Sequence, residues 1–210
     1  AFFALAIERV GMHRRVALGI LRFSGKSSFG LLLAFMVSTA FLSMWISNTS
    51  TSLIMMPIAL AVLAAGGVED EATGGMAGAL ILGIAFAASL GGVGTLVGSP
   101  TNPIATGLIE SQLGLKISFL DWMSFGIPIV LISVPLTAFI LAHVQKIMAT
   151  PFDVVAAKNA IGKAGDWTTS EMRLLPLVLL VISLWLLLPQ LESALPKGSI
   201  TDGTIAIACS

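Results

Sequence analysis

Charged residues are scarce in this chain, making up only 10% of its 210 residues. A soluble domain carries roughly a quarter charged residues, whereas here 56% of the residues are hydrophobic and the mean hydropathy is +0.99. These values exclude an ordinary soluble domain and predict an all-α, multi-pass protein of the cell membrane in contact with the lipid bilayer. The formal net charge is zero, so no surplus of positive charge points to a nucleic-acid partner.

Cysteine is almost absent as well. The single Cys209 can form no disulfide within the chain. The sequence opens on Ala1 inside one apolar stretch and ends at Ser210 inside another. We therefore expect an internal fragment of a longer protein.

The longest stretch without Asp, Glu, Lys, Arg or His runs from Ser27 to Val68, and it contains the polar run Ser47–Ser52. At membrane depth an unpaired backbone group costs several kcal/mol, so a break in a helix is tolerated only inside protein or beside water. The polar run is therefore either the interior of a helix whose hydroxyls bond back to the preceding turn, or a break that builds a site.

The length of the apolar stretch limits its path through the bilayer. As one helix, Phe29–Ala65 would be about 55 Å long at 1.5 Å per residue, which exceeds a hydrocarbon core of about 30 Å. Two possibilities follow: a re-entrant helical hairpin over residues 29–65, or two tight spans. Both return the chain to the side on which it started.

A second interruption is predicted at Gly91–Pro103, where four glycines and two prolines fall within thirteen residues. This composition is incompatible with a straight helix and predicts a broken helix over residues 79–109. We expect Asn102 to cap its second half, with Pro103 at the first helical position. A kink needed for packing, or close approach of a neighbouring helix, would use the same residues.

Two interruptions in neighbouring membrane elements suggest an ion site. A helix that ends leaves free carbonyl groups, which suit a small cation, and a helix that begins leaves free N–H groups, which suit an anion. We expect carbonyls of Ser43–Ser47 and of Gly94–Gly98 on the cation side, and Asn48 and Thr49 as caps on the anion side. Neither interruption contains a carboxylate, which favours sodium over Ca²⁺ or Zn²⁺.

The distribution of Lys and Arg predicts the sidedness of the chain. Residues 8–26 carry five basic residues against one acid, as expected of a cytoplasmic interfacial helix. A membrane span is expected at 123–145, followed by a basic cytoplasmic linker at 146–173. A further span begins within 174–210.

The motifs then resemble those of the divalent anion/sodium symporter family. Ser47-Asn48-Thr49 with Met56-Pro57-Ile58-Ala59 is similar to the Ser-Asn-Thr hairpin of that family. Gly91-Gly92, Gly98 and Thr101-Asn102 are similar to its Gly-rich unwound helix. Two positions depart from the pattern, since Ser99 replaces the usual Thr and Thr101 stands where Pro is often found.

The resemblance implies an elevator-type transporter built from two inverted repeats, not an enzyme. Residues 1–145 would hold most of the first repeat, 146–173 the linker and 174–210 the start of the second repeat. The full-length protein would be a homodimer that carries a small di- or tricarboxylate with Na⁺ as coupling ion. The alternatives are a sodium-independent exchanger, a transporter of another anion such as sulfate, or a membrane scaffold without transport.

The resemblance also assigns residues to the two ligands. The candidate sodium ligands are Ser43, Ser47, Asn48, Gly98 and Asn102. The candidate substrate-binding residues are Asn48, Thr49 and Thr101. Half of the substrate site would lie outside this fragment.

Overall fold

A computed structural model of the chain describes residues 10, 12–22, 24–25, 27–68, 74–161 and 168–194. The expectations for residues 1–9 and 195–210 lie outside the described residues. Within the described part every regular element is a helix. The helices are α2 (Met12–Leu21), α3 (Ser28–Ser43), α4 (Asn48–Ala65), α5 (Gly75–Gly92), α6 (Thr101–Leu113), α7 (Phe119–Val144), α8 (Val154–Ala160) and α9 (Thr169–Ala194).

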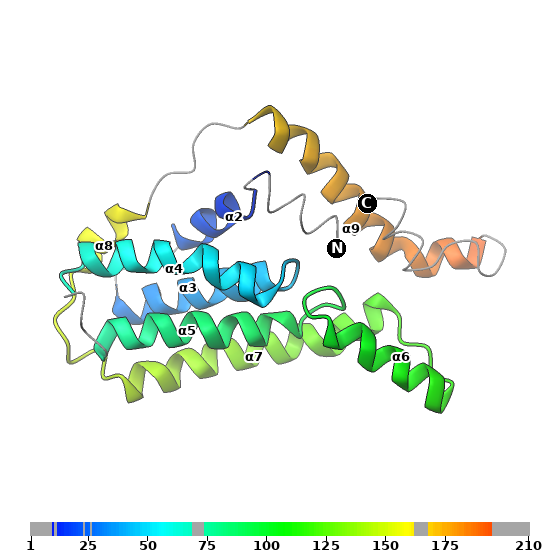
Figure 1. Ribbon diagram of the computed structural model, residues 1–210, viewed down its shortest axis with the longest axis horizontal. Coiled ribbons are helices and arrows are strands. Elements are labelled where there is room, and N and C mark those ends of the chain that lie inside the picture. Colours follow the sequence, from blue (N-terminus) through cyan, green and yellow to red (C-terminus); the bar gives the residue numbers. More distant parts are fainter. Residues whose placement is uncertain are drawn as a thin grey trace.

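Three of the described helices, α4, α5 and α7, are long and apolar enough to cross a membrane. Helix α3 is equally apolar but has only 16 residues, which is about 24 Å at 1.5 Å per residue. The expectation of an all-helical chain with membrane-length apolar segments is confirmed for this part of the molecule. Helices α3, α4, α5 and α7 run alongside one another (Figure 1).

Helices α3 and α5 form the centre of this bundle. Phe35 and Met36 on α3 and Leu80 on α5 are completely buried, and in a membrane such contacts stabilise the bundle by close van der Waals packing. Gly91 permits the closest contact, because a Cβ atom there would lie 2.3 Å from the carbonyl oxygen of Ala40. The two backbones therefore touch near the carboxyl ends of both helices.

The polar run Ser47–Ser52 proves to be mostly helical. Only Met44–Ser47 separate α3 from α4, and Asn48 is already the first residue of α4. The hydroxyl of Ser52 donates to the carbonyl of Asn48 at 2.9 Å, which is the back-bonding expected of a helix interior. Both interpretations of the run hold in part, with the boundary at Ser47.

The segment before α8 contacts the end of α4, and α9 contacts α2, through polar groups. The Asp153 N–H before α8 donates to the Gly66 carbonyl at 3.1 Å, at the end of α4. Arg15 of α2 donates to both carboxylate oxygens of Glu171 in α9, at 3.1 and 3.0 Å. This bond from Arg15, followed by the Thr168 N–H, lowers the pKa of the Glu171 carboxyl to about 2.

Candidate functional site

The two interruptions lie against each other. The α3–α4 and α5–α6 connections are at the same end of the bundle (Figure 1). The hydroxyl of Thr95, in the second connection, donates to the carbonyl of Met44 in the first. The hydroxyl of Ser43 lies 2.7 Å from the carbonyl oxygen of Ala88, on α5.

Ser43 and Asn48 form a polar pair across the first interruption. Ser43 is completely buried, and its Oγ lies 2.6 Å from Oδ1 of Asn48 as well as 2.7 Å from the Ala88 carbonyl oxygen. A serine hydroxyl carries a single proton, so it satisfies one of these two acceptors at a time. If the Asn48 amide is turned, its nitrogen donates to the Ser43 hydroxyl and every group has a partner. If its oxygen faces Ser43, the remaining pair of oxygens suits a cation.

The expected caps of α4 are corrected by the structure. Ser47, not Asn48 or Thr49, is the N-cap residue, and its Oγ accepts from the Ser50 N–H at 3.2 Å. A shorter serine side chain reaches that N–H easily, and the Asn48 amide is thereby free to contact Ser43. The N–H groups of Asn48 and Thr49 remain the free donors at the amino end of α4.

Asn102 does not cap α6 as expected. Pro100 occupies the N-cap position, and no side chain caps the helix. The Asn102 amide instead points back and donates to the carbonyls of Gly92 and Thr95, at 2.7 and 2.8 Å. The Gly92 carbonyl at the end of α5 lacks a helical partner, and the Thr95 carbonyl lies in the loop that follows. The two amide protons reach both oxygens. The amide oxygen of Asn102 is left to accept from another partner.

Gly98 lies where no larger residue fits. A Cβ atom there would be 2.7 Å from the Gly92 carbonyl oxygen and 2.8 Å from that of Ser43. Since both obstacles are backbone atoms, neither can move aside cheaply. Gly98 is therefore held directly against the end of α3.

The structure thus groups four of the seven predicted site residues closely: Ser43, Asn48, Gly98 and Asn102. Ser47 adjoins them through the chain, but its hydroxyl is used as a cap. Thr49 and Thr101 have exposed side chains, and the Thr101 hydroxyl lies 2.9 Å from that of Ser99. No described contact joins either threonine to the group.

Two further residues that the sequence argument missed hold the second connection in place. Thr95 is completely buried and bonds to Met44. The indole Nε1 of Trp122, on α7, donates to the carbonyl of Val93 at 2.8 Å. One signal was available, because Thr95 is the only residue between Gly91 and Gly98 with a polar side chain.

The arrangement provides oxygen ligands for a cation and N–H donors for an anion. Hydroxyl, amide and backbone oxygens gather where α3 and α5 end. These are the ligands that a hard cation such as sodium prefers. Helices α4 and α6 begin beside them, and the amino end of a helix carries partial positive charge and free N–H groups that suit a carboxylate.

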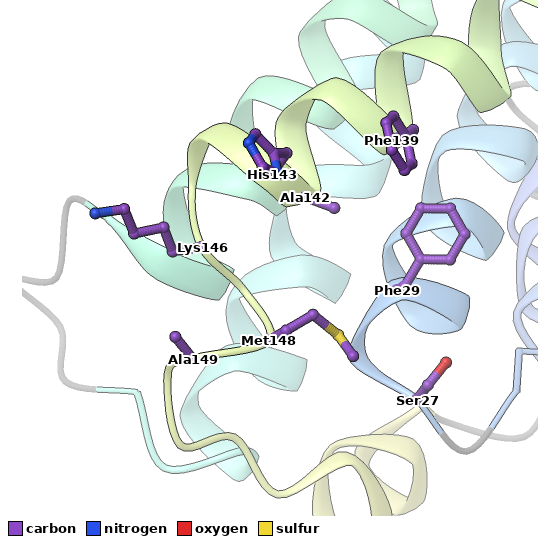
Figure 2. A pocket seen from close by; sticks show the side chains of 8 residues that line it. All are labelled: Ser27, Phe29, Phe139, Ala142, His143, Lys146, Met148 and Ala149. Atoms are coloured by element: carbon purple, nitrogen blue, oxygen red, sulfur yellow. The ribbon is translucent and has the colours of Figure 1, made fainter.

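A groove at the other end of the bundle has a different character. It has a volume of about 710 Å³ and lies between the beginning of α3 and the end of α7. Phe29, Phe139 and Met148 line it, with Ser27 at one edge (Figure 2). Its walls are mostly apolar, and His143 and Lys146 are the nitrogen-bearing side chains among its lining residues.

Comparisons with known proteins agree with the geometry. The sequence pattern of the citrate transporter family matches residues 1–207. The sodium-dependent dicarboxylate transporter SdcS of Staphylococcus aureus strain USA300 is 35% identical over 220 residues, covering 99% of this chain and 42% of that protein. SdcS of strain NCTC 8325 / PS 47 gives the same identity and coverage.

This chain therefore spans about two fifths of the length of the relatives it matches. These proteins and the matching family are transporters, not enzymes. The match extends over nearly the whole chain, including both helix interruptions. The chain belongs to the citrate transporter family.

Proposed function

We propose that the full-length protein is a secondary active transporter that carries a small di- or tricarboxylate across the membrane together with sodium. The observation that carries this proposal is the contact between the two helix interruptions, where uncharged hydroxyl, amide and backbone groups converge. Family membership supports the same function, as does the sodium-dependent dicarboxylate transport named for the relative SdcS.

On the cation side, we assign sodium to the oxygens that converge between the ends of α3 and α5. The ligands would come from Ser43, Ser47, Asn48, Gly98 and Asn102. A cation at this point would be coordinated by the hydroxyl oxygen of Ser43 and the amide oxygen of Asn48, which lie 2.6 Å apart. No side chain in either interruption is charged, so the positive charge of sodium is not neutralised by the protein.

On the anion side, we assign one carboxylate of the substrate to the amino ends of α4 and α6. The free N–H groups of Asn48 and Thr49 begin α4, and Thr101 begins α6. Asn48 belongs to both sites. Bound sodium therefore strengthens the attraction for a carboxylate beside it, and this coupling makes the two ligands bind together.

The remaining architecture is part of the same proposal. Residues 29–65 form a re-entrant hairpin, residues 1–145 most of the first of two inverted repeats, and residues 146–173 a cytoplasmic linker. Residues 174–210 begin the second repeat, which supplies the rest of the substrate site. The whole protein works as a homodimer in the cell membrane and moves its substrate by an elevator-type motion.

Uptake of labelled succinate by the purified full-length protein in lipid vesicles tests the proposal. Uptake is expected with an inward sodium gradient and is expected to disappear when choline replaces sodium. Uptake that persists in choline and requires a dicarboxylate inside the vesicle would show an exchanger. Vesicles without succinate uptake under either condition, but with uptake of sulfate, would show a different anion.

A further inference from the structure

Thr95 is the point at which the two interruptions are joined. Its side chain is completely buried. The hydroxyl donates to the Met44 carbonyl, in the α3–α4 connection, and accepts from the Gly98 N–H at 3.1 Å. Its own carbonyl accepts from the amide of Asn102 at 2.8 Å. One residue therefore links the turn after α3, the loop after α5 and the beginning of α6.

The Thr95 hydroxyl bonds to backbone groups that have no hydrogen-bond partner within a helix. Met44 is the C-cap residue of α3, and carbonyls at the end of a helix have no intrahelical partner. Gly98 lies outside both α5 and α6, and its N–H donates to the Thr95 hydroxyl at 3.1 Å and to the Thr95 carbonyl at a longer 3.4 Å. The hydroxyl of Thr95 serves both groups at once, as one donor and one acceptor.

We propose that Thr95 is a positioning residue for the sodium site: it holds Gly98 against the end of α3 by tying Met44 to the loop. This inference rests on the proposed function of the site. We assign the threonine no direct contact with the cation, because its hydroxyl is engaged by Met44 and by the Gly98 N–H. It fixes the separation between the carbonyl of Ser43 and that of Gly98.

Other buried hydroxyls in the same bundle show that this arrangement is not the ordinary use of threonine. The hydroxyl of Thr39, which is also completely buried, donates to the Phe35 carbonyl one turn earlier in α3 at 2.7 Å. That bond stays within one helix. Thr39 therefore offers a matched control, since Thr39→Val removes a buried hydroxyl without separating the two interruptions.

The test uses Thr95→Val, Thr95→Ser and Thr39→Val in the full-length protein in lipid vesicles. The readouts are the sodium concentration for half-maximal succinate uptake and the KM for succinate at saturating sodium. Loss of the hydroxyl is expected to raise the half-maximal sodium concentration about tenfold, which corresponds to one buried hydrogen bond. Thr95→Ser and Thr39→Val should stay near the wild-type value, and the KM for succinate should change little in all three.

Three outcomes would overturn the inference. The first is a Thr95→Val protein with the sodium dependence of the wild type. The second is an equal loss of uptake in Thr95→Val and Thr39→Val with unchanged sodium dependence, which would show a purely structural role. The third is a rise in the KM for succinate without a change in sodium dependence.

The inference can still be tested if Thr95→Val folds poorly. If Thr95→Val does not accumulate in membranes, Thr95→Ala is used in its place. The readout is then the increase in melting temperature that added sodium gives to the solubilised protein. Weaker stabilisation than in the wild type supports the inference. If neither variant accumulates while Thr39→Val does, Thr95 serves folding and the inference fails. A wild type without any sodium dependence would refute the proposed function itself.

Discussion

At the scale of single residues, Asn48 is the side chain shared by the two ligands. It follows the N-cap residue of α4 and reaches back to Ser43. We predict that Asn48→Ala abolishes sodium-dependent succinate uptake by the full-length protein, because the amide oxygen and the polar pair are both lost. Asn159→Ala, on the exposed side of α8, is the control. Wild-type uptake by Asn48→Ala would contradict the assignment.

A second residue-scale prediction concerns backbone contact. Gly98→Ala places a methyl group within 2.8 Å of two backbone carbonyl oxygens, so the loop has to move away from α3. We expect uptake to fall at least tenfold, as for removal of one buried hydrogen bond or more. Gly107→Ala is the matched control, because no atom lies within 4 Å of its added Cβ. Equal uptake by the two variants would exclude the close contact at Gly98.

A substitution of Thr49 tests whether the sodium and substrate parts of the site are distinct. Its side chain is exposed and belongs to the first turn of α4, beside the donors assigned to the substrate. Thr49→Ala is expected to raise the KM for succinate several-fold, the loss of about one hydrogen bond to a charged group, and to leave sodium dependence unchanged. A change confined to sodium dependence would place Thr49 on the cation side instead.

The structure brings several of the predicted site residues together, but the helix caps that the sequence predicted for Asn48 and Asn102 are wrong. Composition alone reveals where a helix must break at Gly91–Pro103. The cap of each following helix depends on competing partners. Asn48 is drawn to Ser43, and Asn102 is drawn to the end of α5. Both partners belong to a different helix, so local sequence rules do not include them.

At the scale of elements, helices begin and end where capping groups are available. Helix α7 begins at a capping box formed by Ser118 and Asp121 and continues through Pro128 and Pro135. Its 26 residues give about 39 Å at 1.5 Å per residue, enough for a span with tilt. The sequence located this helix well, because its apolar stretch is continuous and its ends are polar.

The ion pair between α2 and α9 gives an element-scale prediction about pH. The pKa of Glu171 lies at about 2 in the folded protein against an ordinary 4.5. A lowered carboxyl pKa adds stability that is complete above the ordinary value and disappears as the pH falls through the folded value. The difference in melting temperature between wild type and Glu171→Gln should therefore be constant above pH 4.5 and should shrink from there toward pH 2.

Glu110 provides the comparison for this measurement. It lies 4.0 Å from Lys116, and both side chains are largely exposed, so the pair contributes little. Glu110→Gln is expected to melt like the wild type at every pH in the series. A Glu171→Gln protein that behaves in the same way would show that Arg15 does not hold α9 to α2 in the full-length protein.

At the scale of the whole molecule, the charge pattern predicts sidedness. The connection between α6 and α7 should face outward, and the basic segment after α7 should face the cytoplasm. We predict that Leu115→Cys reacts with an impermeant thiol reagent in intact cells, in a Cys209→Ser background. Met148→Cys should react only after the membrane is opened. Both positions are well exposed. The reverse labelling pattern would therefore show that the chain has the opposite orientation in the membrane.

The sequence predicts that the two interruptions meet, and the structure confirms the contact, but the packing that brings them together is not visible in the sequence. Each interruption is visible in composition, but their contact depends on how α3 packs against α5. That packing is set by Gly91 on Ala40 and by buried side chains such as Met36 and Leu80. Complementary shapes on two helices leave no periodic signal that a single sequence displays.

The backbone contact at Gly91 also restricts how the protein can change conformation. Two helices that touch without intervening side chains cannot slide past each other unless their core is unpacked. Spin labels on the exposed faces of α3 and α5, at Val37 and Phe86, should therefore report one distance distribution with and without sodium and succinate. Any alternation between inward- and outward-facing states of the full-length protein has to take place at other helix contacts.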